Sequence, residues 1–364
     1  MKKKILLFTD SIGSGGAQRQ LVGLSVLLKN HGFDVKVCTY FDYDFYKLTL
    51  TKNNIPYEII PNAADYKKRI FYVYNYFKSE NPHWIVAYQE TPSMIACIAK
   101  LLGCRFKLLV SERNTSQSLG LRERIRFFLY RFADAVVPNS FAQAKFLLNS
   151  NPWIKPKLHT ITNFVDLEHF GFVKHVKSCS NIIVVAASLL PSKNPVGLIK
   201  AAKILKDKHF KFRIDWYGKI SSQQSYIAQC QLLIDSYGLS SYVRLLDKTQ
   251  QIYIKYAQCD FFCLPSFYEG TPNVICEAIA TGRPVICSDI CDNSHYVLNN
   301  KNGFLFDPKN PQDIASAIEK ALLLSQSEYE SFSNVSRTLA ESKLDKKVFL
   351  NKYLSILLSD LNEK

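Results

Sequence analysis

The segment PSFYEGTPNVICEA, residues 265–278, joins a short apolar run to a second apolar stretch with helical spacing. Thr271 suits the N-cap of a helix, and Pro272 suits its first turn. The segment therefore predicts a loop that leaves the end of a buried strand and opens a helix. At the carboxyl edge of a parallel sheet such a helix start attracts anions, because its free N–H groups and its dipole favour phosphate.

Two carboxylates flank this expected anion site. Glu269 lies in the loop, while Asn273 and Glu277 are four residues apart and share one face of the helix. A carboxylate is a poor ligand for phosphate, but it accepts hydrogen bonds from the hydroxyl groups of a sugar. We therefore expect the carboxylates to bind sugar hydroxyls, with a diphosphate held between them by the helix start. The alternative is an ordinary strand, loop and helix in which both glutamates are solvated.

Apolar runs and amphipathic stretches alternate on both sides of this segment, which predicts parallel sheets with helices on both faces. The expected strands cover residues 4–9, 35–39, 84–88, 106–110, 133–137, 182–187, 212–217, 260–264 and 284–288. The expected helices cover residues 17–29, 94–102, 195–206, 271–281 and 346–361. A polar stretch around residues 168–180, which has no periodicity, interrupts the pattern before it restarts.

A chain of 364 residues suits two α/β domains of about 150 to 200 residues each, with a cleft between them. We place a first Rossmann-like domain at residues 1–170 and a second at residues 171–345. Residues 346–364 form a C-terminal helix that we expect to return to the first domain.

The composition indicates a cytoplasmic protein. Although 47% of the residues are hydrophobic, no apolar run approaches the roughly 20 residues that span a bilayer. The apolar run near the amino terminus stops at Thr9, which is too short for a signal peptide. The ten cysteines show no C-x-x-C pair and no histidine at ligand spacing, so we expect reduced core thiols and no metal site.

A net charge of +15 predicts a surface that attracts phosphates, whether on nucleic acid, anionic lipid or a diphosphate substrate. Because no RNA-binding signature, zinc finger or arginine-rich arm is present, we do not expect nucleic acid. Residues 66–72 and 121–131 mix apolar and basic side chains at helical spacing. Such helices can dock on an anionic membrane surface through Arg122, Arg124 and Arg126, or hold the acceptor's phosphates. Alternatively, they are ordinary amphipathic helices with a charged outer face.

The spacing of Glu269 and Glu277, with Gly282 and Pro284 beyond them, resembles the signature of a large family of retaining glycosyltransferases. This is glycosyltransferase family 4, or glycosyl transferases group 1, whose GT-B fold has two Rossmann-like domains with parallel sheets facing a central cleft. In that family the first glutamate contacts the transferred sugar and the second binds the ribose hydroxyls, roles that fall on Glu269 and Glu277. The resemblance also places in the donor site Gly270, Thr271, Pro272, Asn273 and Val274.

The stretch ASLLPSKN, residues 187–194, is similar to the family's donor-phosphate loop, in which an arginine and a lysine five residues apart grip the diphosphate. Lys193 matches the lysine, and the resemblance makes it catalytic together with Glu269, because it stabilises the leaving group. Ser188 stands where the arginine is usual, which removes one cation from the donor site.

Two further positions follow from the resemblance. Gly218, at the end of the expected strand 212–217, belongs with the donor site. Residues 163–166 are similar to the family's Asn-Gly-Val-Asp segment, but Phe164 stands in place of the glycine.

The acceptor side is predicted from two loops of the first domain. Gly15 and Gly16, followed by Arg19, resemble the family's amino-terminal glycine loop, whose backbone faces the donor phosphate and the acceptor. As a dinucleotide fingerprint this loop is incomplete, so we do not expect NAD. Glu112 and Arg113 follow a strand end, where loops face the cleft, and are candidates to contact the acceptor or the sugar. The alternative is a surface loop with a Glu–Arg ion pair.

These features predict a glycosyltransferase that moves a hexose or an N-acetylhexosamine from a nucleotide sugar, with UDP-sugars favoured. The expected acceptor is lipid-linked or a saccharide, with a polyprenyl-diphosphate-linked saccharide favoured. We place the enzyme in surface polysaccharide or lipopolysaccharide biosynthesis, peripheral on the cytoplasmic face of the membrane.

The resemblance also implies retention at the anomeric carbon, no cofactor and no catalytic metal. Asp42 and Asp44 spell the D-x-D metal motif of the other major glycosyltransferase fold, but they lie far in sequence from the donor motif. Two alternatives remain open: a nucleotide-sugar epimerase of the same fold and a non-catalytic nucleotide-sugar-binding relative.

Overall fold

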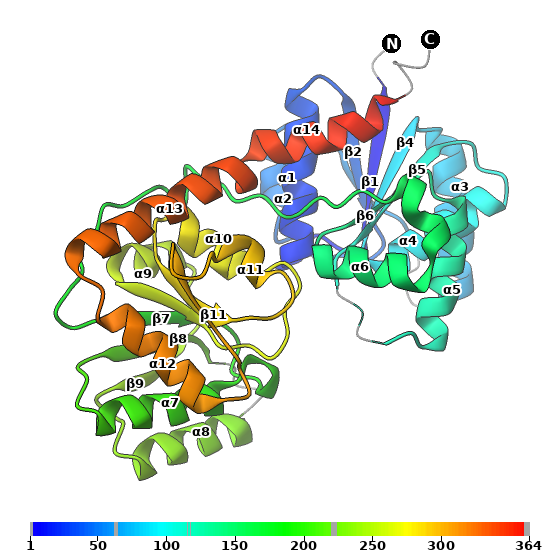
Figure 1. The fold of residues 1–364 in the computed structure, drawn as a ribbon. Helices are drawn as coiled ribbons and strands as arrows, with labels where there is room; N and C mark the ends of the chain where they lie inside the picture. Colours follow the sequence, from blue (N-terminus) through cyan, green and yellow to red (C-terminus); the bar gives the residue numbers. More distant parts are fainter. Residues whose placement is uncertain (1–2, 62–64, 115, 117, 220–223, 360–364) are drawn as a thin grey trace. The chain divides into compact units, whose positions relative to one another are not determined.

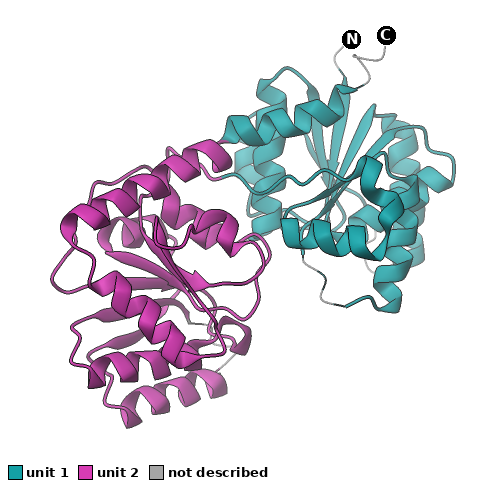
Figure 2. Ribbon diagram, viewed as in Figure 1, with its two compact units in different colours: residues 1–164, 346–364 teal, residues 165–345 magenta. Residues whose placement is uncertain are grey.

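A computed structural model describes residues 3–61, 65–114, 116, 118–219 and 224–359 (Figure 1). The chain forms two compact units (Figure 2). Unit 1 consists of residues 1–164 and 346–364, and unit 2 consists of residues 165–345. Each unit contains a six-stranded parallel sheet with helices, which confirms the α/β class expected from the sequence.

The sheet of unit 1 has the strand order β3-β2-β1-β4-β5-β6. Its strands are β1 (Lys4–Phe8), β2 (Asp34–Thr39), β3 (Tyr57–Ile59), β4 (Trp84–Tyr88), β5 (Lys107–Glu112) and β6 (Ala135–Pro138). Its helices are α1 (Gly16–Asn30), α2 (Lys47–Lys52), α3 (Tyr66–Glu80), α4 (Glu90–Leu101), α5 (Leu121–Leu129), α6 (Phe141–Ser150) and α14 (Lys346–Leu357). Two 3-10 turns, η1 (Tyr130–Phe132) and η2 (Pro152–Lys157), complete the unit.

The sheet of unit 2 has the strand order β12-β11-β10-β7-β8-β9. Its strands are β7 (Ile182–Ala186), β8 (Arg213–Lys219), β9 (Val243–Asp247), β10 (Phe261–Leu264), β11 (Val285–Ser288) and β12 (Gly303–Phe306). Its helices are η3 (Pro191–Lys193), α7 (Pro195–Asp207), α8 (Gln224–Ser236), α9 (Ile252–Gln258), α10 (Asn273–Ala280), α11 (Asn293–Tyr296), α12 (Pro311–Leu322) and α13 (Gln326–Leu344).

Each sheet has a hydrophobic core on both faces, because successive side chains of a strand point to opposite sides. In β1, Leu6 and Phe8 lie in one core, while Ile5 and Leu7 lie in the other. Burial on both faces explains why the sequence of β1 is a nearly continuous apolar run, as is typical of a central parallel strand.

Helix α14 packs on unit 1. Phe349 and Tyr353 are buried in the core that contains Ile5, and the hydroxyl oxygens of Tyr88 and Tyr353 are 2.7 Å apart. The chain passes into unit 2 at Val165, whose amide donates to the Leu344 carbonyl (2.9 Å) and whose side chain lies in a unit 2 core. The boundary therefore falls after residue 164 rather than after residue 170.

Phe164 stands where the resemblance predicts a glycine. Its ring fills the space beside Gly23, where there is no side chain. A Cβ atom on Gly23 of α1 would lie 2.4 Å from the Phe164 ring. The Gln20 side chain fixes the Phe164 backbone, since its Nε2 donates to the carbonyl (2.9 Å) and its Oε1 accepts from the amide (3.0 Å). The Phe164 ring also lies 4.9 Å from that of Phe349, so this residue helps to hold α14.

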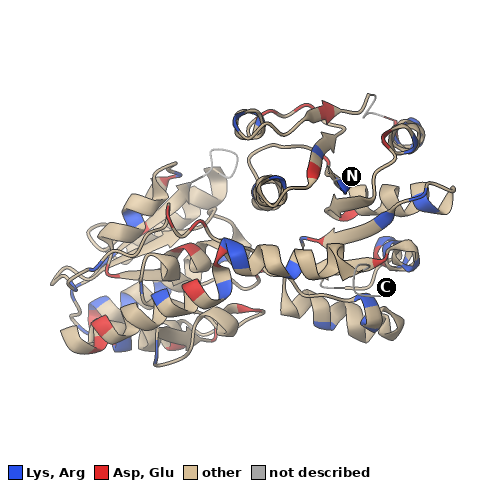
Figure 3. Ribbon diagram, turned by 90° about the horizontal axis from the view of Figure 1, so that it is seen from above, with Lys and Arg blue, Asp and Glu red and all other residues tan. Residues whose placement is uncertain are grey.

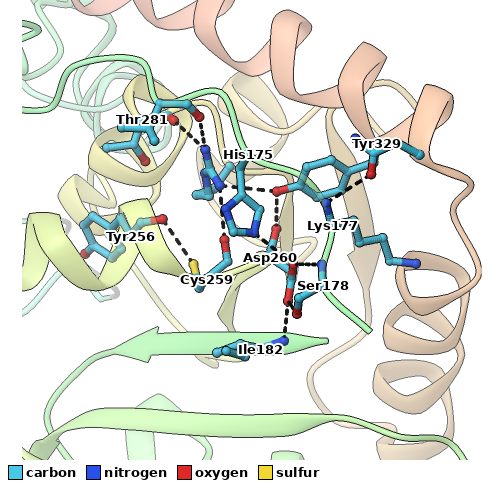
Figure 4. A network of polar contacts seen from close by, with 12 residues as sticks. His175, Lys177, Ser178, Ile182, Tyr256, Cys259, Asp260, Thr281 and Tyr329 are labelled. Carbon is cyan, nitrogen blue, oxygen red and sulfur yellow. Dashed lines mark hydrogen bonds and ion pairs between the residues drawn. The ribbon is translucent and has the colours of Figure 1, made fainter. Parts of the chain in front are cut away.

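A buried polar network fixes the start of unit 2 to its sheet (Figure 4). The Asp260 carboxylate accepts from the Ser178 amide and hydroxyl and from the Ile182 amide, each at 2.6 Å, and lies 3.0 Å from His175 Nε2. Burial alone would raise the pKa of the Asp260 carboxyl, but these hydrogen bonds outweigh it and hold the pKa below its usual value. The network shapes the fold rather than a ligand site.

Candidate active site

The strand order reverses once in each sheet. In unit 1 the chain runs outward through β1, β2 and β3 and returns beside β1 with β4. In unit 2 the same change falls between β7 and β10. Ligands of open α/β sheets bind at the carboxyl ends of the strands at such a switch point. The loops after β1 and β4, and those after β7 and β10, are therefore the places to look for chemistry.

The switch point of unit 2 brings the two predicted catalytic residues together. Lys193, in the loop after β7, places its Nζ 2.6 Å from Oε1 of Glu269, in the loop after β10. The Ser266 hydroxyl donates to the same carboxylate oxygen at 2.6 Å. The Phe267 amide donates to the Ser192 carbonyl (2.9 Å) and joins the two loops through their backbones. The two side chains are partly buried, so a ligand can still reach them.

Helix α10 begins at Asn273, one residue later than the predicted N-cap at Thr271 implies. Pro272, rather than Thr271, is the N-cap, because its carbonyl accepts from the amides of Ile275 (3.0 Å) and Cys276 (3.1 Å). Thr271 instead accepts from the Asn273 amide at 2.9 Å. The prediction of Thr271 as the N-cap is therefore wrong. Gly270 and Thr271 form the short link between Glu269 and the helix.

A cavity of about 220 Å³ lies beside these loops in unit 2. Four of the predicted donor residues line it, namely Ser188, Gly218, Val274 and Glu277. Its other walls are Ala187, which begins the predicted phosphate loop, and Ala186, Tyr217, Lys248, Thr249, Ile252 and Tyr256, which the sequence did not single out. Glu277 is only 4% exposed, and the Tyr256 hydroxyl lies 3.4 Å from its Oε2. A buried carboxylate at a cavity wall is well suited to accept hydrogen bonds from ligand hydroxyls.

Glycine is required at position 218 because the backbone of Ala187 lies too close for a side chain. The φ of Gly218 is +142°, and a Cβ atom there would lie 2.1 Å from the Ala187 carbonyl oxygen. The same carbonyl accepts from Trp216 Nε1 at 2.6 Å, and the Leu189 amide donates to the Gly218 carbonyl at 3.3 Å. Gly218 thus holds the loop that carries Ser188 against the end of β8.

Glu112 and Arg113, predicted to contact the acceptor, are instead buried in unit 1. Glu112 accepts from the Tyr130 hydroxyl and from Gln143 Nε2 (3.1 Å), and forms an ion pair with Arg126 (3.1 Å). Arg113 donates to the Asn163 side chain and lies over the Tyr88 ring, 4.8 Å from its centroid. The prediction is therefore wrong for Glu112, whose carboxylate is enclosed by its protein partners.

The predicted glycine loop lies at the start of α1. Gly15 is the N-cap and Gly16 the first helical residue, while the Arg19 amide donates to the Gly15 carbonyl at 2.9 Å. Neither glycine adopts a positive φ, so backbone conformation does not require glycine here. A Cβ atom on Gly15 would meet the Gln18 side chain at 2.1 Å.

A second cavity, of about 240 Å³, lies at the switch point of unit 1. Asp10 follows β1, and Gln89 and Glu90 follow β4. The remaining walls are Tyr40, Phe41, Arg69, Thr91, Pro92, Asn114 and Arg122. Sequence reasoning missed this cavity, because Asp10 and Gln89 meet only once the strand order is known.

The membrane-docking face expected on helix α5 is wrong for Arg126. Arg126 is fully buried and forms ion pairs with Glu90 (3.0 Å) and Glu112, so it cannot reach a membrane. Leu121, Ile125 and Phe128 occupy the opposite face, and each is exposed, at 76%, 47% and 58%. Lysines and arginines occur on helices of both units (Figure 3). The exposed feature of α5 is thus an apolar stripe that Arg122 and Arg124 flank.

The side chains and helices of the described residues bear on metal binding and membrane spanning. No group of three or more His, Cys, Asp or Glu side chains in this part of the chain is arranged to hold a metal ion. None of the helices formed by these residues is long and apolar enough to cross a membrane. The ten cysteines are free thiols, and most are buried.

Comparison with known proteins identifies the class. A model of "Glycosyltransferase Family 4" matches residues 14–169, and one of "Glycosyl transferases group 1" matches residues 168–338. HepE of Anabaena, solved in complex with UDP, superposes with a TM-score of 0.86 over 99% of this chain and 100% of its own, at 20% identity. The fold and the matched families define a glycosyltransferase of GT-B fold.

Within that class, the chain belongs to the family 4 type of glycosyltransferase. The N-acetylgalactosamine-N,N'-diacetylbacillosaminyl-diphospho-undecaprenol 4-alpha-N-acetylgalactosaminyltransferase of Campylobacter jejuni is 23% identical over 357 residues, which cover 93% of this chain and 95% of that enzyme. The UDP-Gal:alpha-D-GlcNAc-diphosphoundecaprenol alpha-1,3-galactosyltransferase of Escherichia coli is 30% identical over 176 residues, 44% of each chain. Homologues thus include enzymes that act on undecaprenol-linked sugars.

Proposed function

We propose that this enzyme transfers a hexose or an N-acetylhexosamine, with retention at the anomeric carbon, from a UDP-sugar to a polyprenyl-diphosphate-linked saccharide. The reaction belongs to surface polysaccharide or lipopolysaccharide biosynthesis on the cytoplasmic face of a membrane. The observation that carries the proposal is the Lys193–Glu269 contact of 2.6 Å at the switch point of unit 2, beside a cavity with Glu277 in its wall.

The donor is held by three parts of unit 2. The nucleoside occupies the cavity of about 220 Å³, where Glu277 accepts hydrogen bonds from the ribose hydroxyls. The diphosphate lies at the start of α10, residues 270–274, where the helix dipole favours negative charge. Glu269 binds hydroxyls of the sugar to be transferred. Lys248 brings a cation to the cavity wall, where Ser188 has none.

Lys193 stabilises the leaving diphosphate. Without a donor it neutralises Glu269. When the donor binds, its ammonium turns to the diphosphate oxygens and stabilises their developing charge. In the transfer, a bond forms between the acceptor oxygen and the anomeric carbon as the bond from that carbon to the diphosphate breaks. The acceptor's proton passes to a diphosphate oxygen, which conserves charge. Because Lys193 and α10 supply the positive charge, we assign no metal and no cofactor.

The names of the relatives support the two substrates. The Escherichia coli enzyme is named for UDP-galactose, and HepE was solved with UDP, which favours a UDP-sugar donor. The names of the Campylobacter jejuni and Escherichia coli enzymes each include undecaprenol joined to a sugar through a diphosphate. A polyprenyl-diphosphate-linked saccharide is therefore the acceptor that we assign.

Helix α5 supports association with a membrane surface. Its exposed stripe of Leu121, Ile125 and Phe128 is the kind of apolar face that enters the headgroup region of a bilayer. Arg124, beside the stripe, would meet anionic lipid. This geometry fits an enzyme that collects a lipid-linked acceptor from the membrane.

The test is to incubate the enzyme with a panel of UDP-, GDP- and ADP-sugars and undecaprenyl-diphosphate-linked N-acetylglucosamine, with and without EDTA. We expect transfer from a UDP-sugar, an α-linked product from an α-linked donor by NMR, and no loss of rate with EDTA. Epimerised donor without a glycosylated product would instead indicate an epimerase. Hydrolysis alone, or no turnover of any donor, would contradict the proposed transfer.

A further inference from the structure

The two oxygens of the Glu269 carboxylate have different surroundings. Oε1 lies 2.6 Å from Lys193 Nζ and accepts from the Ser266 hydroxyl, also at 2.6 Å. Oε2 has no hydrogen-bond or ion-pair partner among the residues that the structure describes. Each oxygen of a carboxylate can accept hydrogen bonds, so Oε2 retains its full capacity. The protein therefore occupies one oxygen of Glu269 and leaves the other for a ligand.

Ser266 is fully buried, and its backbone is held from two sides. The peptide unit that joins Ser266 to Phe267 accepts at its carbonyl from the Ser288 hydroxyl (2.6 Å) and donates from its amide to the Ser192 carbonyl (2.9 Å). Because both polar groups of this unit are engaged, the peptide plane cannot rotate without the loss of a buried hydrogen bond. The backbone thus holds the Ser266 side chain in the place from which its hydroxyl reaches Oε1.

Ser288, the last residue of β11, continues this chain of contacts. Its Oγ lies 2.6 Å from the Ser266 carbonyl oxygen and 3.2 Å from that of Leu264. Since a hydroxyl has a single proton to donate, the shorter contact is the stronger hydrogen bond. The Ser288 carbonyl accepts from Asn293 Nδ2 at 2.9 Å, and both residues are fully buried. Buried hydrogen bonds thus connect α11 and β11 to the Glu269 carboxylate.

Lys193 cannot hold Oε1 throughout the reaction. In the proposed function its ammonium turns to the diphosphate when the donor binds. Among the described residues, Ser266 is then the one whose hydrogen bond to Oε1 remains. Without that bond the carboxylate would rotate about its own axis, and Oε2 would lose its direction. A group that binds a reacting sugar has to be held within about 0.5 Å of its productive position.

We propose that Ser266 is a positioning residue for the transfer, which holds Oε1 of Glu269 so that Oε2 meets the hydroxyls of the transferred sugar. Ser288 supports this role, because it fixes the peptide unit that carries Ser266. The inference rests on the proposed function, since that function assigns the transferred sugar to Glu269.

The experiment compares Ser266→Ala with the parent. The single-turnover rate of transfer is measured from UDP-glucose, UDP-galactose and their N-acetylamino forms to undecaprenyl-diphosphate-linked N-acetylglucosamine, together with UDP affinity and the thermal midpoint. The matched control is Ser336→Ala on α13, which removes an equally buried hydroxyl that donates to the Arg283 carbonyl at 3.0 Å. Ser266→Cys, which nearly keeps the size but offers a weaker donor, carries the test if Ser266→Ala does not fold.

We expect Ser266→Ala to lower the single-turnover rate at least about tenfold, because a hydrogen bond to a charged group is lost. Its UDP affinity should equal that of the parent, since UDP carries no sugar for Glu269 to bind. Ser288→Ala should lower the rate by less, because the Ser192 carbonyl still holds the peptide unit. Ser336→Ala should transfer at the parent's rate.

A double-variant cycle shows whether Ser266 acts through Glu269. In an enzyme that already carries Glu269→Ala, the carboxylate that Ser266 positions is absent. Ser266→Ala should then change the remaining single-turnover rate by less than about twofold, whereas independent residues would give the same loss in both backgrounds.

Three results would overturn the inference and leave the proposed function standing. One is transfer at the parent's rate by a folded Ser266→Ala or, in its place, Ser266→Cys. Another is a UDP affinity that falls as far as the rate, which would make Ser266 a support of the nucleotide site. The third is an equal loss of rate in the Glu269→Ala background. A parent that binds no UDP and transfers no sugar would instead refute the proposed function, and the inference with it.

Discussion

Replacement of Glu112 by glutamine is expected to destabilise unit 1 rather than to weaken acceptor binding. Glu112 and Arg126 are both fully buried, and Arg126 Nε lies 3.1 Å from Glu112 Oε1. Removal of one partner from a buried ion pair costs about 3 to 5 kcal/mol, because the other charge is left uncompensated. Since Glu90 still contacts Arg126 at 3.0 Å, we expect a loss near the lower limit, about 3 kcal/mol.

Thermal unfolding measures this loss. For a unit of about 150 to 250 residues each 1 kcal/mol lowers the midpoint by about 2 to 4 °C, so about 3 kcal/mol corresponds to about 6 to 12 °C. Glu112→Gln combined with Arg126→Met should recover most of it, because neither charge then remains buried. The matched control is Glu90→Gln, which leaves the Glu112–Arg126 pair intact and should cost less.

The pH dependence of Arg126→Met tests the same pair. Burial raises the pKa of the Glu112 carboxyl, and Arg126 opposes the rise. Without Arg126 the folded-state pKa climbs further above the unfolded value of about 4.3. The folded state then binds the extra proton, so the stability deficit grows as the pH rises above about 4.3 and shrinks on acidification. A parent-like midpoint for Glu112→Gln, with acceptor binding lost, would refute the structural role of Glu112.

Three further predictions concern other parts of the chain. Gly218→Ala should destabilise unit 2 by about 1 to 3 kcal/mol and weaken UDP binding, because its Cβ would lie 2.1 Å from the Ala187 carbonyl oxygen; urea unfolding with a normal midpoint would contradict this. Ser188→Arg should tighten UDP binding by calorimetry, with a gain that falls at high salt, whereas unchanged affinity would mean that Lys248 already supplies the charge. Replacement of Leu121, Ile125 and Phe128 by serine should weaken binding to anionic vesicles by up to about 1.5 to 3 kcal/mol for each side chain that enters the bilayer. Equal sedimentation of the variant and the parent with vesicles would exclude α5 as the docking face.

Much of the fold follows from the sequence because central parallel strands are buried on both faces. The apolar run of β4 predicts its bounds, residues 84–88, without error. Short edge strands escape detection: β3 has three residues and β12 has four, too few to show a period. The sequence also does not predict the late start of α10, because the choice between Thr271 and Pro272 as N-cap depends on which carbonyl accepts the first helical hydrogen bond.

The residues of the candidate site also fall into those that the sequence could predict and those that it could not. The cluster of Ser188, Gly218, Val274 and Glu277 could be predicted, since motif positions at strand ends converge on one sheet edge. Lys248 was missed because it follows β9, a strand with mixed burial that the sequence does not mark.

In unit 1 the sequence predicts that Glu112 lies at the end of a strand, but it does not predict the direction of the Glu112 side chain. That direction depends on Arg126 and Tyr130, which α5 and η1 bring back to it. Asp10 and Gln89 are polar residues after apolar strands, which is the only signal that could have identified them. Their pairing depends on the position of β4 beside β1, which the sequence pattern leaves open.

Calorimetric titration of UDP into the parent enzyme and Glu277→Gln tests the central claim most directly, with Glu341→Gln, an exposed change on α13, as the matched control. We predict that the parent binds UDP and that Glu277→Gln loses about 1.5 to 3 kcal/mol, a factor of about 10 to 150, because a charge-assisted hydrogen bond to ribose becomes a neutral one. Glu341→Gln should match the parent. Equal UDP affinity of the parent and Glu277→Gln, or no binding by the parent, would contradict a donor site built around Glu277 in unit 2.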